Sequence, residues 1–147
     1  MISVLVIMLG SAAALVTRQL HETVNQEQEE KAFHVSEGGV YYVLFLLSSN
    51  SHTMQSLLAQ SEPIEKVIND PLTGQEVGTA TLTFSQPGGY GPGEGIQVRA
   101  VGHDSQDRTC QQIDAIIGAN PYVVRFWDHP RQCAEQSLNQ PPTPTPL

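Results

Sequence analysis

Two short segments of the chain place the residue types of a hydrolytic triad next to one another. His103, Asp104 and Ser105 are consecutive, and Asp128 is followed by His129. A serine nucleophile needs a histidine base that a carboxylate orients, but Asp and Ser are also frequent turn residues. The chain has no Gly-x-Ser-x-Gly, His-Glu-x-x-His or phosphate-loop motif that would support catalysis. We therefore expect turns at these positions, no bound cofactor and no enzyme activity.

Metal chemistry has equally little support in the sequence. The five histidines are scattered, without the spacing of paired zinc ligands. Cys110 and Cys133 supply only half of a tetrahedral site, and no ligand pair near them supplies the rest. A disulfide and two free thiols remain as alternatives. The disulfide is favoured if this part of the chain is extracytoplasmic, because disulfides persist in oxidising compartments.

The composition fits one compact domain with an appendage. The chain has 147 residues, of which 39% are hydrophobic and only 15% charged, and its formal net charge is -8. Nucleic-acid binding requires clustered Lys and Arg, whereas the seven basic residues here are scattered through an acidic chain. We therefore expect no nucleic-acid partner.

The first element that the sequence defines is an uncharged N-terminal segment. Residues 1–16 contain no charged side chain, and the first charge is Arg18. As a helix this segment measures about 24 Å, which is short of the ~20 residues that span a bilayer core. Three interpretations remain: a signal peptide cleaved near Ala14, a short membrane anchor, or a helix start exposed by removal of a basic leader. The third explains why no basic residue precedes the segment and why a helical pattern continues after it.

The segment from residue 17 to residue 47 predicts a continuous helix. It contains no proline and is rich in Gln, Glu, Leu and Ala. Charged residues occupy one face, and apolar residues recur at helical spacing on the other: Phe33, Val40, Leu44 and Leu47. Each glycine of the pair Gly38-Gly39 weakens the helix by about 1 kcal/mol, but apolar residues resume directly afterwards. We interpret the pair as a kink or a close-packing position.

The second half of the chain predicts an antiparallel sheet. Apolar and polar residues alternate over 79–84, 96–100 and 113–117, a fourth apolar run covers 122–127, and a glycine-rich loop follows the first of these segments. Before them, residues 52–59 are expected to form a short helix, and Pro63 is expected to open a further turn over 64–68. Short connections favour a meander, with the amphipathic half of the long helix covering one face. The predicted fold class is therefore α+β.

The chain divides into three parts on this interpretation. Residues 1–50 form the long helix, in which 1–17 is apolar and 18–50 amphipathic. Residues 51–139 form a small globular β head. Residues 140–147 form an extended Pro-rich tail. A Cys110–Cys133 disulfide would close a loop of about two dozen residues and stabilise the head by about 3 kcal/mol.

Residues 32–40, with the sequence Ala-Phe-His-Val-Ser-Glu-Gly-Gly-Val, form a recognisable pattern late in the predicted helix. They resemble the signature late in the first helix of PilX-like minor pilins and related pseudopilins. The residues at the matching signature positions are Ala32, Phe33, Glu37, Gly38 and Gly39. In that family an apolar helix start and an Arg- and Glu-containing middle precede the signature, as they do here. The resemblance covers roughly the first fifty residues and is diffuse in the head.

This resemblance implies a pilin-like fold and a role in a filament. A leader peptidase removes the leader of such a protein, and the new N-terminus is methylated. The subunit is then held in the cytoplasmic membrane until the pilus assembly machinery packs it into a helical fibre. The region around Leu5 lacks the glutamate that many major pilins carry near the helix start, which favours a minor or atypical subunit. Disulfide-closed C-terminal loops are also common among pilins.

We therefore expect a structural subunit of a type IV pilus-like extracellular filament, which resides in the cytoplasmic membrane before assembly. Its partners would be copies of itself or other pilin subunits, packed through the apolar start of the helix. The contacts in the filament core are expected at Ile2, Val4, Val6, Leu9, Gly10, Ala13 and Leu15. The alternative function is a single-pass, membrane-anchored extracytoplasmic binding module that acts as a monomer.

Overall fold

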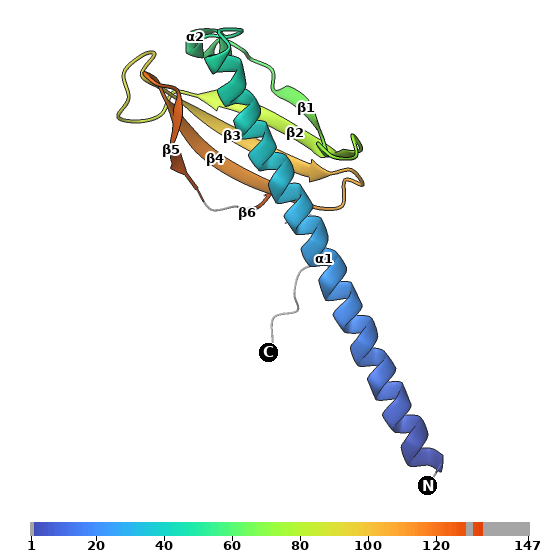
Figure 1. The fold of residues 1–147 in the computed structure, drawn as a ribbon. Helices are drawn as coiled ribbons and strands as arrows, with labels where there is room; N and C mark the ends of the chain where they lie inside the picture. Colours follow the sequence, from blue (N-terminus) through green and yellow to red (C-terminus); the bar gives the residue numbers. More distant parts are fainter. Residues whose placement is uncertain (1, 129–130, 134–147) are drawn as a thin grey trace.

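One long helix carries a small sheet in the computed structural model, which describes residues 2–128 and 131–133, with side chains from residue 14 onward (Figure 1). Helix α1 (Ile2–Ser48) continues without a break through Gly38-Gly39. A short helix, α2 (Met54–Leu58), follows, and a capping box between Thr53 and Ser56 begins it. Figure 1 shows the second half of α1 lying across the sheet, while its first half projects beyond the sheet.

The sheet is an antiparallel meander, as the alternating sequence segments predict. Its strands are β1 (Ile64–Asn69), β2 (Glu76–Ser85), β3 (Gly95–Asp104), β4 (Cys110–Gly118), β5 (Val123–Trp127) and β6 (Arg131–Gln132). Strands β1 to β5 follow one another across the sheet in chain order, and β6 pairs with β4 on the edge that β5 also occupies. Together with α1, the sheet gives the α+β fold expected from the sequence.

The turn expected over residues 64–68 is wrong, because these residues form strand β1. Ile64 and Ile68 pack against the core, and Ile64 lies opposite Leu82 of β2. A charged residue at the core-facing position midway between the two isoleucines hides the alternation in the sequence. That residue, Lys66, places its Nζ atom 4.7 Å from the centre of the Tyr42 ring, a cation–π arrangement that accommodates a charge at a core-facing position. Strand β1 therefore pairs with β2 and also contacts α1.

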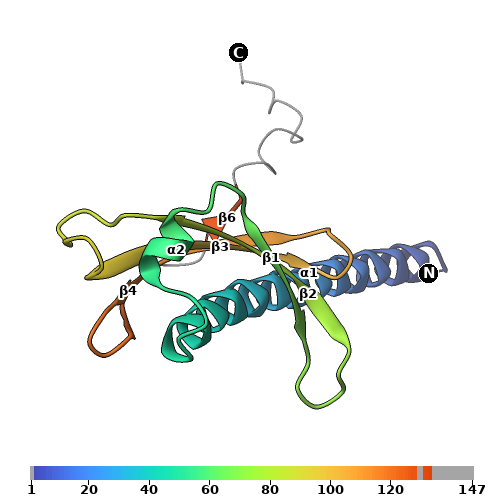
Figure 2. The ribbon, with the colours of Figure 1, turned by 90° about the horizontal axis from the view of Figure 1, so that it is seen from above.

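The core lies between α1 and one face of the sheet, and Figure 2 shows the helix running along that face. The predicted apolar face of the helix is partly correct: Val40 and Leu47 are fully buried, but Phe33 and Leu44 are only half-buried. Small residues shift the buried face of the helix. The fully buried helix residues are Ala32, Val35, Ser36, Val40, Val43 and Leu47, and they face Ala80, Leu82, Ile96, Val98, Ala100, Ile113, Ala115 and Ile117.

Gly39 lets the backbone of α1 approach the sheet closely. A Cβ atom at this position would lie 2.8 Å from Leu82 Cδ2 and 2.9 Å from Ala80 Cβ, closer than carbon atoms pack. Gly102 of β3 has the same role from the other side, because a Cβ there would meet the α1 backbone at Ala32 and Ser36. The glycine pair is therefore a close-packing position and not a helix end.

Adjacent glycines should respond oppositely to the same substitution. Gly39→Ala is expected to lower the free energy of unfolding by about 1–3 kcal/mol, because the new methyl group overpacks the joint with β2. Gly38→Ala should leave that free energy unchanged or raise it by up to about 1 kcal/mol, because its Cβ would lie 3.4 Å from Ile68 Cγ2 and alanine favours the helix. Urea unfolding of the full chain in mild detergent measures both. Equal effects of the two variants would contradict this packing account.

Candidate assembly surface

Two hydrogen bonds between the head and α1, at Gln28 and Glu29, mark the level where the projecting part of the helix begins. The Thr109 hydroxyl donates a hydrogen bond to the Gln28 carbonyl oxygen at 3.0 Å, and Gln132 Nε2 donates to Glu29 Oε1 at 3.3 Å. Before this level, all side chains described, those of residues 14–27, are exposed. We call residues 2–27 of α1 the stalk, which measures about 39 Å at 1.5 Å per residue.

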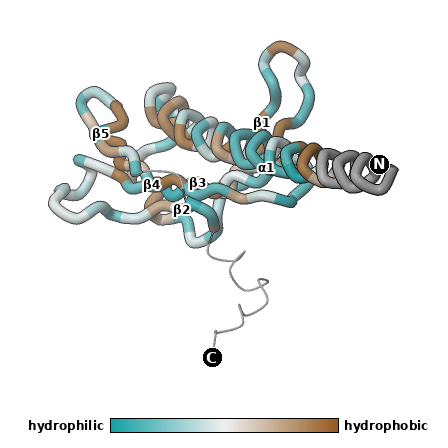
Figure 3. The backbone as a smooth tube through the Cα atoms, turned by 90° about the horizontal axis from the view of Figure 1, so that it is seen from below, coloured by the Kyte–Doolittle hydropathy of each residue, from teal (hydrophilic) through white to brown (hydrophobic). Residues whose placement is uncertain are grey.

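The stalk exposes large apolar side chains that a monomer in water would bury. The exposed fractions are 62% for Leu15, 55% for Val16, 61% for Leu20 and 46% for Val24. Val16, Leu20 and Val24 are spaced four apart and so form a ridge along the helix. In Figure 3 hydrophobic segments alternate with hydrophilic ones along α1. Within the part of the chain whose side chains are described, no helix is both long and apolar enough to cross a membrane.

A second exposed apolar pair lies on the half of α1 that crosses the sheet. Tyr41 is 53% exposed and Phe45 is 63% exposed. The Tyr41 ring lies 6.2 Å from the ring of Trp127 on β5, within the range of aromatic pairs. We call Tyr41 and Phe45 the aromatic pair. Their spacing of four residues was visible in the sequence, but their exposure in the folded chain was not.

Of the residues predicted for the filament core, Leu15 lies on the exposed stalk. The other six belong to the helix, but their side chains lie outside the described residues: Ile2, Val4, Val6, Leu9, Gly10 and Ala13. Leu20 and Val24 extend the apolar surface further toward the head than the sequence-based prediction did. The contacts themselves stay a prediction.

The five signature residues contribute mainly to the joint between helix and sheet. Ala32 and Gly39 are buried against the sheet. Phe33, Glu37 and Gly38 are half-buried, and Glu37 Oε2 lies 3.3 Å from His34 Nδ1 on the outer side of the helix. This segment therefore fixes the position of the head on α1, with small residues where the backbone is closest to the sheet.

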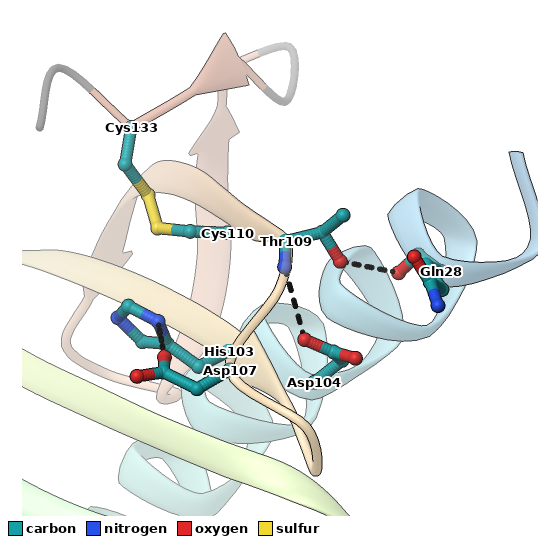
Figure 4. Close-up of a disulfide and its surroundings, with 7 residues drawn as sticks. All are labelled: Gln28, His103, Asp104, Asp107, Thr109, Cys110 and Cys133. Atoms are coloured by element: carbon teal, nitrogen blue, oxygen red, sulfur yellow. Dashed lines mark hydrogen bonds and ion pairs between the residues drawn. A yellow bond between two sulfur atoms is a disulfide. The ribbon is translucent and has the colours of Figure 1, made fainter. Parts of the chain in front are cut away.

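The predicted disulfide is present between Cys110 and Cys133, whose Cα atoms lie 5.7 Å apart. Figure 4 shows it next to the contact between Thr109 and Gln28, so the bond lies close to the level where the stalk leaves the head. Cys110 begins β4, and Cys133 directly follows β6. The disulfide thus holds the two-residue strand β6 in place.

Two of the triad residue types, His103 and Asp104, make contacts within the turn between β3 and β4. Asp104 Oδ1 accepts the backbone N–H groups of Arg108 and Thr109, at 2.7 and 3.0 Å, and so stabilises the turn between β3 and β4. His103 Nδ1 pairs with Asp107 Oδ1 at 2.8 Å (Figure 4). His129 lies outside the described residues. Among the described residues, no group of three or more His, Cys, Asp or Glu side chains is placed to hold a metal ion.

One buried carboxylate ties three strands together on the face of the sheet opposite α1. The Asp114 side chain on β4 is only 8% exposed and binds Arg99 Nε of β3 at 2.9 Å and Arg131 Nη2 of β6 at 2.7 Å. Burial by itself raises the pKa of Asp114, but the Arg99 hydrogen bond and charge, helped by Gln112 and Arg131, lower it below the usual pKa of an aspartate. Asp114 therefore stays ionised and fastens β6 to the sheet.

This pairing should make the stability of the head depend on pH in acid. Because the folded pKa is lowered, Asp114 stabilises the head fully above its unfolded pKa, and this stabilisation is lost as the pH falls through the folded pKa. Asp114→Asn is expected to lower the free energy of unfolding by about 1–2 kcal/mol at pH 7. The difference from the wild type should shrink below pH 4. A difference that stays constant from pH 7 to pH 2 would contradict this assignment.

No protein-family model, curated protein or solved structure matches the chain. The function of the chain is therefore inferred from its own surfaces. Of these, the stalk is the most distinctive, because it combines exposed apolar side chains with a length that the head does not need for its own core.

Proposed function

We propose that the chain is a structural subunit of a type IV pilus-like extracellular filament in which the stalks of neighbouring copies pack together. The observation that carries the proposal is the exposure of Leu15, Val16, Leu20 and Val24 on a helix that projects from a folded head. Each of these side chains is roughly half exposed, and covering it contributes about 1 kcal/mol. Contacts between stalks would therefore supply several kcal/mol per subunit.

Other features of the molecule support the same role. A continuous helix connects the stalk rigidly to the head, so a packed stalk fixes where its head lies. The core of the head and its disulfide involve no described side chain of the stalk. The resemblance of residues 32–40 to the helix signature of PilX-like minor pilins and pseudopilins agrees with this division of roles. A disulfide also suits an extracytoplasmic head.

The apolar side chains of the stalk must also be shielded from water before the subunit is assembled. We propose that the apolar start of the helix resides in the cytoplasmic membrane and leaves it when the subunit joins the fibre. Lipid and packed protein are similarly apolar, so this transfer changes the hydrophobic energy little, and close packing decides the contact. The partners in the fibre are copies of the chain or other pilin subunits. The leader peptidase and the pilus assembly machinery act on the subunit before it enters the fibre.

Electron microscopy of material sheared from the producing cells, with mass spectrometry of the same fraction, tests the proposal. We expect thin, helically ordered fibres that contain this chain, and its abundance in them separates a major from a minor subunit. Membranes from the sheared cells serve as the matched fraction. If the chain stays there as a monomer and no fibre contains it, the proposal is wrong and a membrane-anchored binding module takes its place.

A further inference from the structure

We infer that Leu20 and Val24 of one copy dock against the aromatic pair, Tyr41 and Phe45, of a neighbouring copy in the same fibre. This inference rests on the proposed function and names the contact that builds the fibre. Both pairs are exposed on α1, and both consist of apolar residues four apart. Residues at this spacing form a ridge, and the ridge of one helix fits a groove of another. The chain therefore carries both halves of a helix–helix contact.

The first residues of the two pairs and the second residues of the two pairs are the same number of positions apart along the helix. Tyr41 lies 21 residues after Leu20, and Phe45 lies 21 residues after Val24. At 1.5 Å per residue, this separation corresponds to about 31 Å along the helix axis. At about 100° per residue, the two pairs point within about 60° of one another. Two parallel copies shifted by about 31 Å thus bring both pairs level, and a rotation of about 120° between the copies turns the pairs toward one another.

The surroundings of the aromatic pair suit an apolar partner. From residue 38 to residue 61 the sequence contains no Asp, Glu, Lys or Arg. The nearest charge on the same ridge is Glu37, one turn before Tyr41, and its Oε2 atom lies 3.3 Å from His34 Nδ1. On the stalk, Arg18 and Glu22 pair with each other at 3.6 Å, with side chains 82% and 66% exposed. They can stay hydrated at the rim while Leu20 and Val24 are covered, because long charged side chains keep their ends in water.

One such contact buries too little surface to hold a dimer together, so we infer that the contact repeats in an assembly. A buried aromatic side chain covers about 150–250 Å², and both aromatics here are already partly covered, so one contact removes on the order of a few hundred Å² from water. Stable dimers bury about 1,200–2,000 Å² in total. Each copy offers the contact twice, once through its stalk and once through its aromatic pair. Different patches that meet with an axial shift do not close into a ring, so the contact repeats along an open fibre.

Cysteine cross-linking within fibres tests the register. Leu20→Cys and Tyr41→Cys are made in separate chains and produced together, so that any link joins two copies. A second matched combination is Val24→Cys with Phe45→Cys, and the mismatched control is Leu20→Cys with Leu72→Cys, because Leu72 is 94% exposed on the head. After mild oxidation of sheared fibres, non-reducing gels should show covalent dimers for both matched combinations, in at least tenfold excess over the control.

A helical reconstruction of wild-type fibres checks the same register without substitutions. We expect neighbouring copies with touching α1 helices to be displaced by about 31 Å along the axis. Intact fibres that show neither the matched links nor this displacement would overturn the inference and leave the filament function standing. A lack of this chain in any wild-type fibre would overturn the filament function itself. The two failures are therefore distinguishable.

Discussion

Replacing Leu15 with aspartate is expected to abolish fibre formation while the head stays folded. Leu15 is 62% exposed on the stalk, well before Gln28, where Thr109 of the head forms a hydrogen bond with α1. A substitution there cannot disturb the core, and it acts only on whatever covers the stalk. Burying an unpaired carboxylate costs several kcal/mol, which matches or exceeds the several kcal/mol that the stalk contacts are expected to supply per subunit. The cost recurs at every subunit, so the yield of fibres should fall at least a hundredfold.

Leu72→Asp is the matched control, because it makes the same chemical change at a side chain that is 94% exposed on the head. This variant should give fibres at the wild-type yield. Electron microscopy and sedimentation of sheared material measure the yield, and thermal unfolding shows that both heads fold. The membrane fraction shows whether the Leu15→Asp chain reaches the membrane before assembly fails. Normal fibres from the Leu15→Asp variant would mean that the stalk is not the packing surface.

The elements with a strong sequence period could be predicted. Helix α1 has no proline between residues 17 and 47, and strands β2, β3 and β4 alternate apolar and polar residues. These local patterns were sufficient to predict a meander covered by a helix. The sequence left a disulfide and two free thiols as alternatives for Cys110 and Cys133, and the structure contains the disulfide.

The helix face could not be predicted as well, because small residues carry little hydrophobic signal. Ala32, Ser36 and Gly39 lie where the α1 backbone approaches the sheet most closely. The hydrophobic pattern pointed to the larger residues Phe33 and Leu44, which in the structure are only partly buried against the core. Which side of a helix is buried depends here on how closely two backbones can approach, and that distance is a property of the assembled pair.

Strands β1 and β6 were missed because contacts distant in the sequence stabilise them. In β1, Lys66 occupies a core-facing position under the ring of Tyr42. Strand β6 has only two residues, and it is held by Arg131 on Asp114 and by the neighbouring Cys133. The exposed apolar residues of the stalk were only partly predicted for a related reason. Leu20 and Val24 lie in a polar segment, and only the position of the head reveals that no other described residue covers them.

Removing the disulfide is expected to lower the free energy of unfolding by about 3 kcal/mol. The double variant Cys110→Ser/Cys133→Ser frees a loop whose ends are 23 residues apart, and the unfolded chain gains the corresponding conformational freedom. A small head has a total stability of about 5–15 kcal/mol, so this loss is a large part of it. Urea unfolding of the full chain in mild detergent, with one m-value fitted to both proteins, measures the difference.

Without the disulfide, unfolding should begin where β6 of the head contacts α1 at the base of the stalk. Without the bond, β6 is held by its two-residue pairing with β4 and by the Arg131 ion pairs, so Gln132 is expected to lose its contact with Glu29. Amide hydrogen exchange in β6 and at the start of β4 should therefore accelerate more than exchange in β2 and β3.

Reductant added to the wild type should reproduce this exchange pattern, and reductant should have no effect on the double variant. A wild-type free energy of unfolding in the double variant would show that the bond does not support the joint. If the contact between Gln132 and Glu29 opens while β2 and β3 stay protected, the disulfide supports the edge of the head next to the stalk and not its core. Fibres of the double variant should then still form, with heads that proteases remove faster than wild-type heads.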